Sequence, residues 1–195
     1  ANGYTVADFG HQRIGDDFPI DVLPNAVDAG LLPQLTREEK QALRRELIGD
    51  VDRELILSVG RLTPQKGFEH LLQAFAHVHE KYPKATLVLA GSGRLLDSLT
   101  EQIRALGLVG HAFLLGQRDD VPRLLAVADI YVNSSLLEGT CVSVLEAMAA
   151  GLPIVATRVG DTPYLLDSDS GILVPPAQPE KTAEALIGLL SNSKQ

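Results

Sequence analysis

Short apolar runs alternate with amphipathic segments along most of the chain. The runs are rich in Val, Ile and Leu and are bounded by Gly, Pro, Asp or Asn, which is typical of strands buried in a sheet. They comprise residues 54–62, 85–91, 112–116, 129–133, 153–157 and 171–175. Helical periodicity marks the segments between them, as for Leu71, Phe75 and Val78 on one face of a predicted helix. The alternation predicts an α/β fold, a Rossmann-like parallel sheet with helices on both faces.

The N-terminal part of the chain has a weaker pattern. Residues 1–19 hold scattered Gly, Asp and Pro, and we expect them to form a poorly ordered lead-in, a linker or part of a preceding segment. The apolar run 20–23 predicts a short strand, and turn-forming residues follow it. Thr36 and Glu39 have the spacing of a capping box, which predicts the start of a helix.

Residues 133–157 predict the end of a strand, a loop, a short helix and the next strand. Val142, Leu145 and Ala149 recur at helical spacing, and we expect them to face the core. The first turn of such a helix exposes unpaired backbone N–H groups and the positive end of the helix dipole. This turn is therefore a candidate site for an anionic group.

Two carboxylates bracket the start of this helix. Seven residues separate Glu138 from Glu146. Gly139 has no Cβ, so a ligand can approach the backbone closely. The pattern favours a phosphate near Gly139–Cys141, with Glu146 bound to sugar hydroxyls, because a carboxylate among apolar residues needs hydrogen-bond donors. An ordinary packed helix with two solvent-facing glutamates is the alternative interpretation.

Composition narrows the class of protein. A chain of 195 residues, 45% of them hydrophobic, can form one domain with its own core. A net charge of −8 argues against a general nucleic-acid surface. The single cysteine, Cys141, excludes an internal disulfide framework and suits a reducing, cytoplasmic compartment. No apolar run approaches the roughly 18 residues of a membrane span.

Ligands of parallel sheets bind beyond the carboxyl ends of the strands. Loops rich in Gly, Ser, Thr and Arg are expected to converge at that edge, namely residues 60–61, 91–93, 116–118, 133–139 and 157–162. Asp167 and Asp169 have the D-x-D spacing of some metal sites, but their position in a predicted turn favours a solvated loop. We expect no metal site.

A set of segments in fixed order carries a family resemblance. The segments are SVGRLTPQKGFEHLLQAF, VLAGSG, FLLGQRDDVPRLLAVADIYVNSSLLEG, VLEAMAAGLPIVATRVG and GILVPP. They resemble the C-terminal half of a retaining GT-B glycosyltransferase of family 4, the glycosyl transferases group 1. The resemblance covers roughly residues 20–190 and implies that residues 20–195 form a nucleotide-sugar donor-binding domain. It implies transfer of a hexosyl group from a UDP- or GDP-sugar to a sugar or lipid-linked acceptor.

The resemblance also implies roles for individual residues. Arg61 and Lys66, beside Gly60, match the cations that grip the donor's diphosphate without a metal ion. Glu138 would contact the donor sugar, and Glu146 would accept hydrogen bonds from the ribose. Glu138, Arg61 and Lys66 are accordingly the candidate catalytic residues.

Further donor contacts follow from the same resemblance. Backbone N–H groups for the phosphates and the sugar would come from Gly139, Thr140, Cys141 and Val142. Arg118 lies where the family often meets the base, although an ion pair with Asp119 or Asp120 is equally compatible with the sequence. The donor would be a substrate, and no cofactor is expected.

The chain departs from the family pattern in two places. Thr140 and Cys141 replace an aromatic residue and a glycine, and VGDTPYL replaces the common GG-x-P-E, so Tyr164 stands where an acidic residue is usual. Cys141 is expected to be a buried, inert thiol. The departures leave two alternatives open, a non-catalytic nucleotide-binding or scaffold module and half of a nucleotide-sugar epimerase.

The implied partner is an N-terminal acceptor domain, which in the family carries the acceptor site and a catalytic histidine. Any membrane contact would be made through that domain, at the inner face of the membrane. The chain alone is expected to bind donor and to turn over little.

Overall fold

The computed structural model describes residues 3–14 and 19–192. In this part of the chain six strands form one sheet, in the order β3-β2-β1-β4-β5-β6, and every neighbouring pair is parallel. The strands are β1 (Leu55–Val59), β2 (Thr86–Ala90), β3 (Ala112–Leu114), β4 (Ile130–Asn133), β5 (Ile154–Thr157) and β6 (Ile172–Val174). The Rossmann-like parallel sheet predicted from the apolar runs is confirmed.

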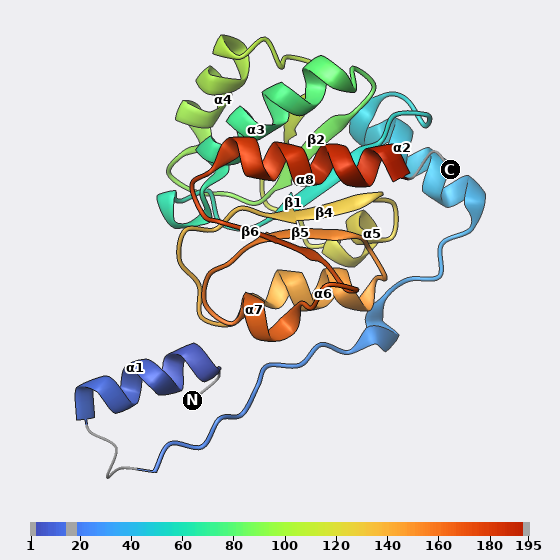
Figure 1. Ribbon diagram of the computed structural model, residues 1–195. Helices are drawn as coiled ribbons and strands as arrows, with labels where there is room; N and C mark the ends of the chain where they lie inside the picture. Colours follow the sequence, from blue (N-terminus) through green and yellow to red (C-terminus); the bar gives the residue numbers. More distant parts are fainter. Residues whose placement is uncertain (1–2, 15–18, 193–195) are drawn as a thin grey trace.

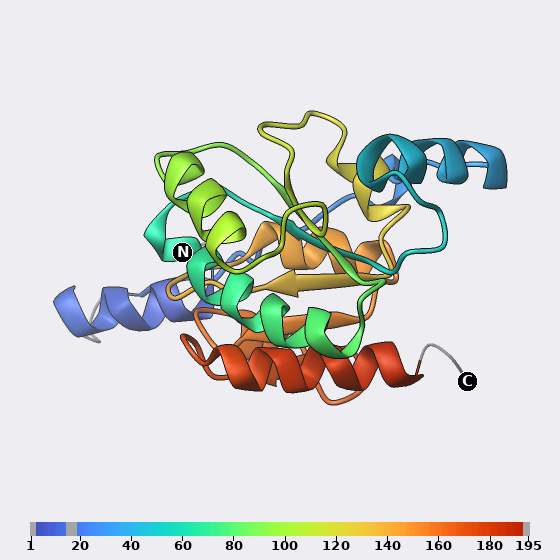
Figure 2. The ribbon, with the colours of Figure 1, turned by 90° about the horizontal axis from the view of Figure 1, so that it is seen from above.

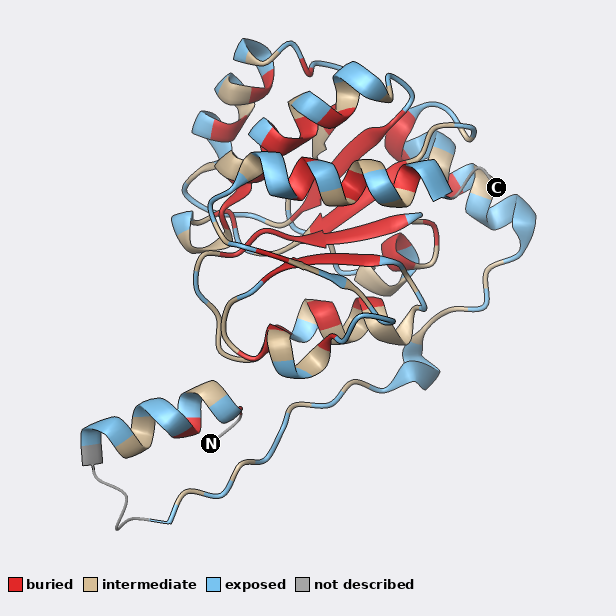
Figure 3. Ribbon diagram, viewed as in Figure 1, coloured by how far each residue is buried: buried red, intermediate tan, exposed pale blue. Residues whose placement is uncertain are grey.

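Helices cover both faces of the sheet (Figures 1 and 2). One face packs against α3 (Phe68–Lys81), α4 (Leu96–Ala105) and α8 (Pro179–Asn192). The other packs against α2 (Arg37–Ile48), α5 (Val121–Leu125) and α6 (Val142–Ala149). Ile56 and Leu57 point to opposite faces of β1, and both are fully buried. Figure 3 shows the same buried centre along the strands and the inner sides of the helices.

Local sequence signals position several of these helices. Thr36 Oγ1 accepts a hydrogen bond from the Glu39 amide at 3.2 Å, and the Thr36 amide donates to Glu39 Oε2 at 2.8 Å. This capping box begins α2 as predicted. Short 3-10 helices precede α2 and α3, namely η1 (Ala29–Leu31) and η2 (Pro64–Lys66), and α7 (Thr162–Leu165) follows β5. No helix of the described residues is long and apolar enough to cross a membrane.

The N-terminal residues include a helix that the sequence pattern did not predict. Residues Tyr4–Ile14 form this helix, α1, which lies apart from the sheet, and an extended segment leads from residue 19 toward α2 (Figure 1). The predicted strand at residues 20–23 is wrong, because that segment pairs with no strand among the described residues. The division into a lead-in of residues 1–19 and a donor-binding domain of residues 20–195 stays a prediction.

The predicted core face of α6 is also wrong. Val144 and Ala147 are the fully buried residues of this helix, whereas Val142 is 43% exposed and Leu145 and Ala149 are only partly buried. The helix is apolar on nearly every side, so both sets of positions have helical spacing and the pattern alone selects neither.

Candidate functional site

Loops at the carboxyl edge of the sheet pack directly against one another. The Gly60 amide donates to the Ala90 carbonyl at 3.0 Å, and the Gly91 amide donates to the Gly116 carbonyl at 2.7 Å. A Cβ on Gly91 would lie 1.9 Å from the Gly60 oxygen, and the φ of Gly91 is +149°. Only glycine fits at this crossing, which holds the ends of β1 and β2 together.

A cavity of about 380 Å³ opens at this edge. It is lined by Val59, Gly60, Arg61, Ala90, Gly91, Ser92, Gln117, Arg118 and Val121. The structure therefore brings the candidate residues Gly60, Arg61 and Arg118 into one cavity. Arg61 is exposed and forms no ion pair with any described residue. Its charge is available to an anionic ligand.

Arg118 is held in place by a carboxylate. Its Nε and Nη2 atoms donate to Asp120 Oδ1 and Oδ2 at 2.7 and 2.8 Å. Glu46 Oε1 lies 3.9 Å from Arg118 Nη1. The hydrogen bonds from Arg118 lower the pKa of Asp120, and they raise the pKa of Arg118 in turn. The ion pair that the sequence allowed is present, with Asp120 rather than Asp119, and it fixes the guanidinium at the wall of the cavity.

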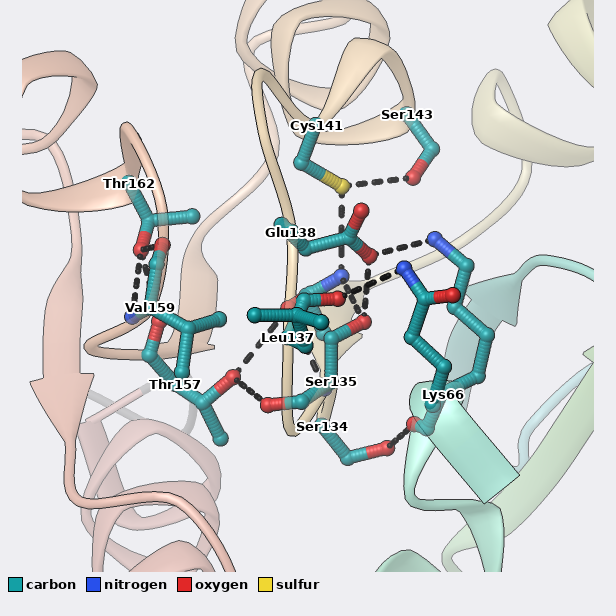
Figure 4. A network of polar contacts seen from close by, with 12 residues as sticks. Lys66, Ser134, Ser135, Leu137, Glu138, Cys141, Ser143, Thr157, Val159 and Thr162 are labelled. Atoms are coloured by element: carbon teal, nitrogen blue, oxygen red, sulfur yellow. Dashed lines mark hydrogen bonds and ion pairs between the residues drawn. The ribbon is translucent and has the colours of Figure 1, made fainter. Parts of the chain in front are cut away.

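Lys66 and Glu138 form an ion pair across the edge of the sheet (Figure 4). Their side chains are only 15% and 9% exposed, so the two charges are largely withdrawn from water. Ser135 Oγ donates to the same Glu138 oxygen at 2.6 Å. The stem of Lys66 runs along Gly60, where an added Cβ would lie 3.2 Å from Lys66 Cε. Two candidate residues thus meet in a single polar cluster.

The loop that carries Glu138 is fastened to the loop that carries Lys66. Ser134 Oγ donates to the Lys66 carbonyl at 2.9 Å. The Leu136 amide donates to the Gln65 carbonyl at 2.7 Å, and Gln65 Nε2 donates to the Leu137 carbonyl at 2.8 Å. The relative position of Lys66 and Glu138 is therefore set by backbone contacts as well as by their own charges.

Buried polar side chains form hydrogen bonds with the loop that carries Glu138 (Figure 4). Asn133 Nδ2 donates to Ser135 Oγ and to Cys141 Sγ, each at 3.2 Å. Thr157 Oγ1, at the end of β5, donates to the Ser135 carbonyl at 2.6 Å. The sequence placed Asn133, Ser135 and Thr157 among the rim loops but gave no sign of these contacts, which only the pairing of β4 with β5 creates.

The first turn of α6 lies beside this cluster. Cys141 is the N-cap residue and is 2% exposed, in agreement with a buried thiol. The Cys141 carbonyl accepts hydrogen bonds from the amides of Val144 and Leu145, at 3.1 and 3.4 Å. Thr140 Oγ1 donates to Asp161 Oδ2 at 2.5 Å. The candidates Gly139, Thr140, Cys141 and Val142 are thus consecutive residues at a helix start.

Glu146 lines a different cavity, of about 300 Å³. The lining residues are Ala26, Val27, Asp28, Leu31, Leu32, Pro122, Leu125, Val142, Glu146 and Ala149. Burial raises the pKa of Glu146. Val121 lines the first cavity and Pro122 the second, so the start of α5 lies between them. Glu146 therefore lines this second cavity, whereas Glu138 lines neither of the two.

Metal-ligating side chains are scattered over the described part of the chain. No group of three or more His, Cys, Asp or Glu residues there could hold a metal ion. Asp167 and Asp169 lie in an exposed turn, where Asp167 Oδ1 accepts hydrogen bonds from Ser170. They form the solvated loop expected from the sequence.

The family follows from a match to a family model. Residues 39–195 match the model of the glycosyl transferases group 1. The chain belongs to this family. The parallel sheet and its helices are the Rossmann-like half of the GT-B glycosyltransferase fold.

Solved structures and curated relatives are similar to most or all of the chain. HepE from Anabaena, solved in complex with UDP and glucose, superposes with a TM-score of 0.88 at 26% identity, covering 100% of this chain and 53% of HepE. The C-terminal domain of LpcC from Francisella tularensis gives a TM-score of 0.74 at 26% identity, covering 87% of this chain and 90% of that domain. A GDP-mannose-dependent phosphatidylinositol monomannoside mannosyltransferase from Corynebacterium glutamicum is 29% identical over 203 residues, covering 97% of this chain and 51% of that enzyme. The chain spans 33%, 41% and 51% of three curated relatives.

Proposed function

We propose that this chain is the donor-binding half of a retaining glycosyltransferase of family 4. It binds a UDP- or GDP-hexose, and a second, N-terminal domain binds a sugar or lipid-linked acceptor. The observation that carries the proposal is the cluster of Lys66, Glu138 and Ser135, placed between the arginine-lined cavity and the first turn of α6. Cations, a helix start and a carboxylate are the groups that a nucleotide sugar needs.

The diphosphate is bound by positive charge and backbone amides. Arg61 at the cavity mouth and Lys66 beside Gly60 supply two cations within one loop. The start of α6 and the residues just before it add the N–H groups of residues 139–142 and the positive end of the helix dipole. Together they stabilise the charge that develops on the leaving diphosphate, without a divalent cation.

The nucleoside and the sugar extend from the diphosphate in different directions. Arg118 and the cavity wall around it receive the base, and Glu146 accepts hydrogen bonds from the ribose hydroxyls. The raised pKa of Glu146 supports this role, because a desolvated carboxylate gains from hydroxyl donors. HepE was solved with UDP, and the relative from Corynebacterium glutamicum is named as GDP-mannose-dependent, so uracil and guanine both stay candidate bases.

Glu138 holds the donor sugar at its reacting face. Its carboxylate already accepts from Lys66 and Ser135, so its orientation is fixed before the donor arrives. In the reaction the bond from the anomeric carbon to the diphosphate breaks. The acceptor oxygen takes its place with the same configuration, and the acceptor proton leaves with the diphosphate.

The acceptor is bound elsewhere in this proposal. The relatives are about twice as long as this chain or longer, which supports a second domain as the source of the acceptor site. The chain alone then binds donor and turns over little. The activity is cytoplasmic, and any contact with the inner face of the membrane is made by the second domain.

Calorimetry tests the proposal directly. UDP, GDP, UDP-glucose and GDP-mannose are titrated into the chain, each with Mg²⁺ and with EDTA. One nucleotide and its sugar should release heat, and the affinity should persist in EDTA. No heat with any of the four would favour a scaffold module that kept only the fold. Loss of binding in EDTA would overturn the metal-independent part of the proposal.

A further inference from the structure

Two residues that depart from the family pattern, Thr140 and Tyr164, lie close together with Asp161. Thr140 follows the Glu138 loop, and Asp161 and Tyr164 lie in the loop and helix after β5. All three surround the first turn of α1, which comes from the opposite end of the chain. The donor site as described does not include this contact with α1.

Asp161 caps α1 from outside the helix. Its Oδ1 accepts a hydrogen bond from the Thr5 amide at 2.9 Å, while its Oδ2 accepts from Thr140 Oγ1 at 2.5 Å. The first turn of α1 contains no acidic residue of its own, so this carboxylate supplies the negative charge that a helix N-terminus favours. Burial would raise the pKa of Asp161, but hydrogen bonds from Thr140, Thr5 and Tyr4 outweigh it and lower the pKa.

Apolar and steric contacts support the same arrangement. The rings of Tyr4 and Tyr164 lie 5.1 Å apart at an angle of 35°, a favourable geometry for two aromatic side chains. A Cβ on Gly3 would lie 1.9 Å from Asp161 Oδ2, so a side chain there would displace the carboxylate. Tyr164, which stands where the family usually has an acidic residue, thus contacts α1 through its ring.

The capping residue is also fastened to the loop of the donor site. The Asp161 amide donates to the Gly139 carbonyl at 2.9 Å, and Gly139 follows Glu138 directly. A Cβ on Gly160 would lie 2.3 Å from the same carbonyl, which shows how closely the two loops approach. Asp161 therefore touches α1 with its side chain and the Glu138 loop with both its side chain and its backbone.

We propose that Asp161 is a positioning residue that joins α1 to the Gly139–Thr140 end of the loop carrying Glu138. The inference rests on the proposed function, because Glu138 is the residue that meets the donor sugar. By fixing the Gly139–Thr140 end of the loop, Asp161 affects binding of the donor sugar more strongly than binding of the nucleoside diphosphate, which Arg61 and Lys66 also hold. Tyr164, which stands where the family usually has an acidic residue, contacts the same turn of α1.

Hydrogen exchange and calorimetry on the full chain test this proposal together. Asp161→Ala removes both side-chain acceptors, whereas Asp161→Asn keeps one oxygen for one partner. Asp169→Ala is the matched control, because it removes an exposed carboxylate of the same charge from a nearby turn. Circular dichroism and thermal unfolding first establish that each variant folds.

The expected results separate anchoring from positioning. In Asp161→Ala the amides in the first turn of α1 should exchange about tenfold faster or more, as for loss of a charged cap. The ratio of UDP-sugar to UDP affinity should fall by about five- to tenfold, because the affinity for the UDP-sugar falls further than the affinity for UDP. For both the exchange rate and the affinity ratio, Asp161→Asn should give values between those of Asp161→Ala and the original chain. Asp169→Ala should match the original chain. If the chain binds guanine nucleotides, the affinities are measured with GDP and a GDP-sugar instead of UDP and a UDP-sugar.

Each contrary result has a distinct meaning. Unchanged exchange in α1 would overturn the anchor, whether or not nucleotides bind. Faster exchange with equal losses for UDP and its sugar would overturn the positioning role and leave a purely structural cap. If the chain binds no nucleotide at all, the proposed function and the positioning role both fail, while exchange still decides the anchor. If Asp161→Ala does not fold, the same comparisons are made with Asp161→Asn.

Discussion

Glu138 and Glu146 flank one short helix start, yet their carboxylates have opposite surroundings. Glu138 is paired with Lys66 and accepts a hydrogen bond from Ser135, whereas burial raises the pKa of Glu146 at the wall of a second cavity. The first carboxylate is therefore preorganised in the chain without ligand, whereas the second accepts no hydrogen bond from the side chains and loops of the described residues and is available to a ligand's donors. Mutations at the Lys66–Glu138 pair and at Glu146 should therefore have different effects.

Lys66→Ala should destabilise the fold as well as the site. Because Glu138 would keep its burial and lose its cation, we expect the free energy of unfolding to fall by about 1–3 kcal/mol. Urea denaturation monitored by circular dichroism measures this change. The double variant Lys66→Ala/Glu138→Ala should recover part of the loss, since no buried charge is then left unpaired. Equal stability of Lys66→Ala and the original chain would contradict the importance of the pair.

Arg61→Ala should affect binding alone. Arg61 is exposed, so we expect the free energy of unfolding to change by no more than about 0.5 kcal/mol. The affinity for UDP should fall by about 1.5–3 kcal/mol, as for a hydrogen bond to a charged group, and the affinity for uridine should stay the same. Titration calorimetry with both ligands measures the difference. Equal losses for UDP and uridine would overturn the phosphate contact.

Glu146→Ala should weaken binding of the nucleoside part. Loss of charged hydrogen bonds to the ribose is expected to cost about 1–3 kcal/mol in affinity for UDP and for uridine alike. Glu146→Gln should not lower the stability of the free chain, because it removes a charge that burial already disfavours. An unchanged affinity for uridine in Glu146→Ala would speak against the ribose contact.

Stability should decrease on mild acidification because of two histidines far from the site. The rings of His79 and His111 lie 4.0 Å apart, and Arg53 donates to His111 Nδ1 at 2.6 Å. Burial lowers the pKa of both histidines, the nearby charge of Arg53 lowers both further, and His79 adds to the shift of His111. The folded chain therefore binds fewer protons than the unfolded chain between the lowered pKa values and the ordinary value of about 6.5.

The sign of this effect follows from proton linkage. Where the unfolded state binds more protons, the free energy of unfolding rises with pH, so it is highest above about pH 6.5 and falls as the solution is acidified. Thermal unfolding from pH 7.5 downward should show this slope, and the double variant His79→Gln/His111→Gln should flatten it. The same slope in both chains would assign the effect to other groups.

The strands could be predicted from the sequence because each is a short apolar run, and β2, β4 and β5 are buried along their whole length. The face of α6 could not, since Val142 and Val144 are equally apolar and only the packing of the helix separates them. The candidate residues Gly60, Arg61 and Arg118 came from loops that the predicted sheet already placed at one edge, and the structure finds them around one cavity.

Contacts between distant segments were beyond a single sequence. Tyr4, Val6 and Phe9 of α1 are exposed, and the first turn of this helix is held by Asp161 and Tyr164 from the other end of the chain. Local propensity carries no record of a partner more than a hundred residues away. The contact of Ser135 with Glu138 is local, but it depends on the bend of the loop between them, which the sequence pattern does not specify.

The order of the strands also bears on how fast the chain can fold. The centre of the sheet needs Ile56 beside Ile130 and Leu57 beside Tyr131, and all of α3, α4 and α5 lies between these partners in sequence. Closing so long a loop costs entropy before any pairing repays it, so sheets of this kind form slowly compared with helical bundles. During synthesis, β1 and β2 can pair early, but β1 keeps one unpaired edge until β4 has left the ribosome. Chaperone dependence during that interval is the expected biological cost of this topology.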